Sequence, residues 1–117
     1  DELDLIRSHK IKVFSNKSRL TSIKEANKKK YKILIMDDGY QDISIKPVLN
    51  ILCFNSNQLI GNGMTIPSGP LRESFNSINR SKIILINGKR KIYFENKIKK
   101  ISKNIKIFYS EYIPQKF

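Results

Sequence analysis

Two adjacent carboxylates, Asp37 and Asp38, follow the apolar run Ile33–Met36 and precede Gly39. Neighbouring carboxylates repel one another unless something neutralises them. Mg²⁺ would do so, because it prefers one or two carboxylates together with waters and substrate phosphates. A plain turn is the alternative, since Asp is favoured where a turn starts and Gly where φ is positive. By itself this stretch predicts either a metal site at a strand tip or an ordinary turn.

A glycine-rich stretch, Gly61–Ser74, follows later in the chain. Pro70 suits the first turn of a helix, which we expect over Pro70–Ser81, and backbone N–H groups of such a loop can bind phosphate. Arg72 could add a planar fork of donors to that phosphate. Glu73 could supply a carboxylate to the same metal or orient the arginine. The alternative is a flexible loop closed by a helix cap, with both side chains as surface charges.

Short apolar runs predict the scaffold that holds these residues. Ile33–Met36, Val48–Phe54 and Ile83–Ile86 have strand length and are largely apolar, as expected where helices cover both faces of a parallel sheet. Helical patterns alternate with them. Alternation of this kind argues for a layered α/β domain with a mostly parallel sheet and right-handed crossovers. Ligands of such sheets gather at the carboxyl ends of the strands.

Weaker patterns precede this scaffold. An opening helix carries Leu3, Leu5 and Ile6 on one face, and His9 lies near its end. We expect His9 to cap that helix or to face solvent, and we assign it no catalytic role. A short strand is predicted over Ile11–Phe14. A helix is predicted over 18–30, with a serine as its N-cap and lysines at its C-terminus.

The chain becomes Lys-rich after Gly88. Here the pattern predicts Tyr93 and Phe94 in a strand. It predicts a short basic helix carrying Ile98 and Ile101, and then a last strand over 105–109.

Composition bounds the class of protein. A chain of 117 residues allows one domain or part of one. The 23 Lys and Arg against 10 Asp and Glu give a net charge of +13, which can steer a protein toward nucleic acid, anionic lipid or phosphorylated ligands. An AT-rich genome would also enrich Lys, Ile and Asn. Cys53 is the only cysteine, which excludes a disulfide framework or a cysteine metal site within this chain and fits a reducing compartment.

An acidic strand tip of this kind is the Walker B arrangement of P-loop enzymes, but the P-loop itself is missing. No Gly-x-x-x-x-Gly-Lys-Ser/Thr sequence occurs, and the only Gly-Lys, Gly88-Lys89, is followed by Arg90. The first residue is Asp1 rather than Met, and the chain opens on a helix already under way. We therefore expect the natural product to extend upstream.

Together, and in this order, the two stretches resemble the tetraacyldisaccharide 4'-kinase family, the lipid A kinases of Gram-negative bacteria. That family shows an apolar strand ending in Asp-Asp-Gly-Phe-Gln-His, matched here by 37–42, where Asp42 replaces the His. It then shows a Gly-Asn-Gly loop and Pro-Ala-Gly-Pro-Leu-Arg-Glu, matched by Pro67–Glu73. The resemblance is good over 1–88, the central part of the kinase α/β domain. It is weak over 89–117, a basic continuation.

The resemblance implies an incomplete, P-loop-kinase-like α/β/α domain and an ATP-dependent enzyme. Asp37 and Asp38 would hold or orient Mg²⁺, with Asp38 close to the chemistry. Arg72, Glu73 and Gln41 would lie near the nucleotide, Glu73 also near the metal. Asp1 would match the carboxylate that activates the sugar hydroxyl.

The same resemblance implies a substrate and a location. The substrate would be the 4' hydroxyl of a lipid-linked tetraacyl disaccharide 1-phosphate, and nucleic acid would not be a partner. The full-length protein would contact the cytoplasmic face of the bacterial inner membrane peripherally. The family's P-loop, its membrane-associating helix and a histidine partner of the catalytic Asp all lie outside this chain. We therefore expect the isolated chain to be inactive.

Two competing hypotheses stay open. A small basic module for nucleic acid or anionic lipid would rest on the charge of +13 and on lysines clustered at Lys28–Lys32 and Lys97–Lys106. It leaves the carboxylate pair and the glycine loop unexplained. A degenerate or truncated gene product without activity is the other.

Overall fold

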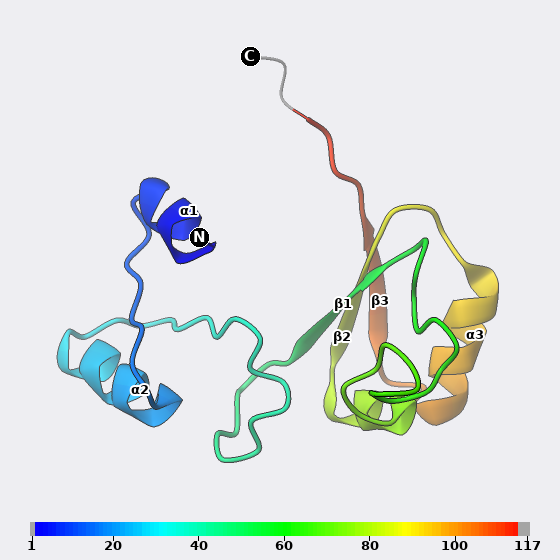
Figure 1. Ribbon diagram of the computed structural model, residues 1–117, viewed down its shortest axis with the longest axis horizontal. Coiled ribbons are helices and arrows are strands. Elements are labelled where there is room, and N and C mark those ends of the chain that lie inside the picture. Colours follow the sequence, from blue (N-terminus) through cyan, green and yellow to red (C-terminus); the bar gives the residue numbers. More distant parts are fainter. Residues whose placement is uncertain (1, 115–117) are drawn as a thin grey trace. The chain divides into compact units, whose positions relative to one another are not determined.

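The computed structural model describes residues 2–114 and divides into two compact units, 1–39 and 40–117. The two units are described one at a time, because their relative positions are not determined (Figure 1). The division falls directly after Gly39. Asp37 and Asp38 therefore belong to the first unit, and the glycine loop belongs to the second.

The first unit contains two helices, α1 (Glu2–Ser8) and α2 (Arg19–Lys28). At the end of α1, His9 Nδ1 is hydrogen-bonded to the Leu5 carbonyl oxygen at 2.9 Å, so His9 caps the helix as expected. The predicted helix over 18–30 is confirmed in a slightly shorter form. Ser18 stands at its N-cap position with extended backbone but makes no side-chain capping bond.

Two strands predicted in this unit are wrong. Ile11–Phe14 and Ile33–Met36 have no regular secondary structure. A strand is stabilised by hydrogen bonds to a neighbour, and the described sheet is made of other segments. Ile33 and Ile35 are 80% and 90% exposed, so α1 and α2 do not bury these side chains as the covering helices expected for this apolar run would.

The second unit is built on a three-stranded parallel sheet in the order β1-β2-β3. The strands are β1 (Ile51–Asn55), β2 (Ile83–Asn87) and β3 (Lys106–Ser110). The 3₁₀ helix η1 (Phe75–Arg80) precedes β2, and α3 (Ile92–Ile101) joins β2 to β3 (Figure 1). The predicted α/β class with a parallel sheet is confirmed.

Alternation along the strands decides which face of the sheet is buried. Ile84 and Ile86 on β2 are fully buried, as are Phe94 and Ile98 of α3, and these four belong to one core cluster. The intervening positions form the other face, where Cys53 and Phe108 are exposed. One face of the sheet therefore packs on helices. The second helical layer expected from the sequence is not among the described residues of this unit.

Two local predictions in this unit need correction. Pro70, Arg72 and Glu73 form bends, and Leu71 forms an isolated bridge with Thr65. The helix expected from Pro70 begins only at Phe75 and is of the 3₁₀ type. Tyr93 and Phe94 lie in α3 rather than in a strand. Phe94 stands one helical turn from Ile98, and its ring contacts Phe54 with centroids 5.2 Å apart. The helical spacing of buried residues outweighs the strand preference of two aromatic residues.

Candidate active site

The carboxylates Asp37 and Asp38 lie in an exposed turn of the first unit. Turn preferences predicted a positive φ at Gly39. In the structure Asp38 has the positive φ, 48°, so an aspartate adopts the left-handed conformation of this turn. A Cβ on Gly39 would stand 3.2 Å from the Met36 Cβ, so the glycine serves a close approach. Arg19 Nη2 donates a 2.7 Å hydrogen bond to the Asp38 carbonyl oxygen, which ties the turn to the start of α2.

The residues after this turn open the second unit. Gln41 is exposed. Asp42, which stands where the family usually has His, accepts hydrogen bonds through Oδ1 from the backbone N–H and the hydroxyl of Ser44. Asp42 therefore stabilises a local turn, a role that a carboxylate suits through its acceptor oxygens.

Asn62 organises the glycine-rich loop. Its Oδ1 accepts from the Met64 N–H at 3.0 Å, and its Nδ2 donates to the Ser68 carbonyl oxygen at 2.7 Å. A Cβ on Gly69 would collide with the Asn62 side chain and the Met64 backbone. Only glycine fits at this position, which gives a physical reason for the glycine in the Pro67–Glu73 motif.

Several backbone amides of this loop donate within the loop. The N–H groups of Ser68 and Gly69 both donate to the Thr65 carbonyl oxygen at 3.0 Å, and Leu71 N–H donates to the Met64 carbonyl oxygen at 3.1 Å. These three amides are therefore occupied by carbonyl oxygens of the same loop.

Glu73 forms an ion pair with Arg80. Arg80 Nη2 lies 2.6 Å from Glu73 Oε2, and the Arg80 Cζ stands 4.7 Å from the centroid of the Tyr40 ring. The Tyr40 hydroxyl in turn donates a 2.6 Å hydrogen bond to the Ser77 carbonyl oxygen. We call Tyr40, Glu73, Ser77 and Arg80 the Arg80 cluster. Arg72, the other motif residue, is exposed.

The pKa shifts of Tyr40 and Arg80 agree with this geometry. Burial raises the pKa of Tyr40, so its hydroxyl stays protonated and remains a donor. The hydrogen bond to Glu73 raises the pKa of Arg80, which is charged in any case. Sequence reasoning missed both residues. The signal available was Tyr40 itself, because the family motif has Phe there and the added hydroxyl needs a partner when half-buried.

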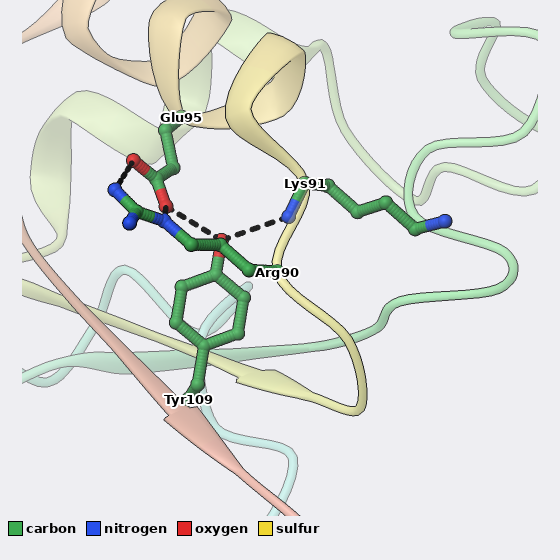
Figure 2. Close-up of polar contacts among 4 residues, drawn as sticks. All are labelled: Arg90, Lys91, Glu95 and Tyr109. Carbon is green, nitrogen blue, oxygen red and sulfur yellow. Dashed lines mark hydrogen bonds and ion pairs between the residues drawn. The ribbon is translucent and has the colours of Figure 1, made fainter.

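A second polar group lies at the carboxyl ends of β2 and β3 (Figure 2). Arg90 Nε and Nη2 donate to the two carboxylate oxygens of Glu95 at 2.8 and 3.2 Å. The Tyr109 hydroxyl donates to Glu95 Oε1 at 2.8 Å and accepts from the Lys91 N–H at 3.2 Å. The Arg90 hydrogen bonds, followed by that of Tyr109, lower the pKa of Glu95 to about 2. We call these four residues the Glu95 network.

A cavity of about 350 Å³ lies next to the Glu95 network and is lined by Gly88, Lys89, Tyr109, Ser110 and Glu111. It occupies the strand ends at which parallel sheets commonly bind ligands. Gly88 has a φ of 109°, and a Cβ there would meet the Ser56 hydroxyl, so this turn also requires glycine.

The carboxylates of Asp37 and Asp38, as oxygen donors, fit Mg²⁺ better than a transition metal. Within residues 2–114 no group of three or more His, Cys, Asp or Glu side chains gathers as a metal-binding set. Mg²⁺ needs only one or two carboxylates, because waters and phosphates complete its shell, and Asp37 and Asp38 are exposed and adjacent.

The expected catalytic Asp1 lies outside the described residues. No helix of the described part is long and apolar enough to cross a membrane.

Known proteins similar to this chain agree on one family. The family model described as tetraacyldisaccharide-1-P 4'-kinase matches residues 1–117. A tetraacyldisaccharide 4'-kinase of Pelagibacter ubique is 41% identical over 116 residues, covering 97% of this chain and 37% of the relative. One of Geobacter sulfurreducens is 40% identical over 45% of this chain and 15% of the relative.

The similarity reaches beyond bacteria. A probable mitochondrial tetraacyldisaccharide 4'-kinase of Arabidopsis thaliana is 34% identical over 70% of this chain and 22% of the relative. No solved structure matches. This chain spans 37% of the length of the Pelagibacter relative, so it corresponds to part of such a protein's length. With a match along all of its residues, the chain belongs to the tetraacyldisaccharide-1-P 4'-kinase family.

Proposed function

We propose that this chain supplies the Mg²⁺-binding part of an ATP-dependent kinase that phosphorylates the 4' hydroxyl of a tetraacyl disaccharide 1-phosphate in lipid A biosynthesis. The observation that carries the proposal is the exposed pair Asp37 and Asp38, in a turn anchored by Arg19, within a chain that matches the kinase family along its whole length. The names of the relatives support the substrate.

In this proposal each motif residue has a separate task. Asp37 and Asp38 hold Mg²⁺, which when bound neutralises the charge that develops on the transferred phosphoryl group. Arg72 offers its fork of N–H donors to nucleotide phosphates, and Gln41 lies on the nucleotide side. Glu73 contributes a carboxylate near the metal. Asp1 activates the sugar hydroxyl as general base.

The proposal includes a location. The full-length protein would work on the cytoplasmic face of the bacterial inner membrane, in peripheral contact with it, because its substrate carries acyl chains. The net charge of +13 supports this, since cations near a surface are attracted to anionic lipids and phosphates. Under this proposal nucleic acid is not a partner.

The test replaces Asp37 and Asp38, one at a time, with Asn in the full-length protein that contains this chain. Each variant should lose roughly 100-fold or more of its Mg²⁺-dependent phosphoryl transfer, because an amide neither neutralises nor binds the ion as a carboxylate does. Transfer to the disaccharide is measured with labelled ATP. Glu25→Gln is the matched control, because it also removes one carboxylate from the first unit. Glu25 lies on α2 and forms a surface ion pair with Lys29. Wild-type rates in both Asn variants would contradict the metal assignment.

A further inference from the structure

Arg80 makes contact with one residue from each of the two sequence motifs. It is the last residue of η1, and its guanidinium pairs with Glu73 at 2.6 Å. The same group stands over the ring of Tyr40, which directly follows Gly39. The hydroxyl of that ring is fixed in turn on Ser77, within η1. One arginine therefore joins the first motif, through Tyr40, to the carboxylate that ends the second.

The chemistry of these contacts is specific to arginine. A guanidinium is planar, so it can stack on an aromatic ring and donate in its own plane to a carboxylate at the same time. A lysine ammonium is a compact point charge and cannot fix both directions. The Arg80 and Glu73 side chains are 37% and 27% exposed, and partly exposed pairs contribute little to stability. The main consequence of the contact is the direction in which Glu73 points.

The ion pair uses only one of the two oxygens of Glu73. Arg80 engages Oε2, which leaves Oε1 outside that contact. A carboxylate held by one oxygen loses much of its rotational freedom, so part of the entropy cost of ordering the second oxygen has been met before a ligand arrives. An arrangement of this kind suits a carboxylate that must meet a metal ion or its water with the other oxygen.

We propose that Arg80 is a positioning residue of the kinase, which acts through Glu73 by fixing its carboxylate while stacking on Tyr40. This inference rests on the proposed function. Arg80 touches neither substrate nor metal in this account. Its removal should therefore lower kcat more than it weakens the binding of Mg²⁺ with ATP, because most ground-state contacts to the nucleotide are made by other residues.

A double-mutant cycle tests this directly in the full-length protein. Arg80→Gln should lower kcat about tenfold, and Glu73→Gln should lower it by at least as much. The double variant should be no slower than Glu73→Gln alone, because a residue that acts through another has no effect once the other is gone. Arg80→Lys keeps the charge but not the planar fork, and it should recover little of the lost rate.

Arg90→Gln is the matched control, because it breaks another Arg–Glu pair of the same unit, to Glu95. It should shift the Tm at least as much as Arg80→Gln and leave the dependence of kcat on Glu73 unaltered. Strictly additive losses in the Arg80 and Glu73 cycle, or full recovery by Arg80→Lys, would overturn the inference.

The same cycle is read in parallel as the rise in Tm produced by Mg²⁺ with ATP, which requires no disaccharide. A wild-type protein that is stabilised by Mg²⁺ with ATP but leaves the disaccharide unmodified would contradict the proposed substrate. The Arg80 inference would then be tested by the Tm rise alone, which should be smaller in Arg80→Gln and in Glu73→Gln and no smaller in the double variant than in Glu73→Gln; additive losses would overturn it. A wild-type protein that neither reacts nor is stabilised would overturn both.

Discussion

At the residue scale, Glu95 shows how this small unit accommodates a buried carboxylate. Its side chain is 9% exposed, yet both oxygens accept hydrogen bonds from Arg90, and Oε1 also accepts from Tyr109. Fully bonded carboxylates of this kind favour the charged form. The Glu95 network ties the start of α3 to β3, the strand that follows α3 in the chain (Figure 2).

The Glu95 network predicts a loss of stability in acid. The pKa of Glu95 is lowered from 4.5 to about 2 by its hydrogen bonds, with Arg90 contributing most. Because the folded pKa lies below the unfolded one, the stabilisation is present above pH 4.5 and disappears as the pH falls toward 2. The Tm advantage of the wild type over Glu95→Gln should shrink across that window. A difference in Tm that stays constant with pH would contradict the assignment.

Gly69 gives a second prediction at this scale. Gly69→Ala should destabilise the loop by about 1 to 3 kcal/mol, because the added Cβ would collide with Asn62 and with the Met64 backbone. Chemical denaturation measures the loss, and faster hydrogen exchange at Leu71 would locate it, since Leu71 N–H donates to the Met64 carbonyl oxygen. The exposed neighbour Ser68→Ala is the control and should change stability by less than about 0.5 kcal/mol.

At the element scale, α3 supplies much of the core that covers the sheet. Phe94 and Ile98 are fully buried, and the Phe94 ring contacts those of Phe54 and Phe75. Tyr93 lies beside Phe94 on the same helix but is 65% exposed. The helix therefore provides neighbouring aromatic residues in opposite environments.

The pair predicts a large contrast between adjacent substitutions. Phe94→Ala should lower the free energy of unfolding by about 3 to 5 kcal/mol, because it removes buried surface and leaves a cavity. Tyr93→Ala should change it by about 0.5 kcal/mol or less. Urea unfolding monitored by circular dichroism measures both values. Similar losses in the two variants would mean that α3 does not pack on the sheet as described.

The sequence correctly predicted those elements whose pattern of apolar residues matches the pattern of burial in the structure. β2 and β3 were predicted within one residue, because apolar runs of strand length between helices are a strong local signal. Ile33–Met36 has the same signal but is not a strand, because a strand also needs a neighbour to pair with, which the composition of a segment does not reveal. The early start of the helix at Pro70 was wrong because residues 64–71 bond to one another and hold Pro70 in a bend.

The candidate site was predicted in part for similar reasons. The two motifs could be found from residue order, and their match to the family is confirmed. The partner of Glu73 could not, because Arg80 lies seven residues later across an irregular segment and a 3₁₀ helix, where no fixed spacing brings side chains together. The assignments of Asp37, Asp38, Gln41, Arg72 and Asp1 stay predictions.

At the scale of the whole molecule, the charge of +13 is compatible with both the kinase and the basic-module hypothesis, and the salt dependence of nucleic-acid binding separates them. A nucleic-acid binder that neutralises several phosphates loses affinity steeply and log-linearly with salt. The kinase account predicts only weak duplex or single-strand binding near physiological salt. Fluorescence anisotropy across a salt titration measures this. Tight binding with a steep salt slope would favour the basic module.

The central claim is tested most directly by the reaction itself. The full-length protein that contains this chain is incubated with ATP, Mg²⁺ and tetraacyl disaccharide 1-phosphate, and the lipid is analysed by mass spectrometry, with a chelator-treated sample as control. The account predicts a product with one added phosphate at the 4' position, formed only when Mg²⁺ and ATP are both present. A folded, ATP-binding protein that leaves the disaccharide unmodified under these conditions would contradict it.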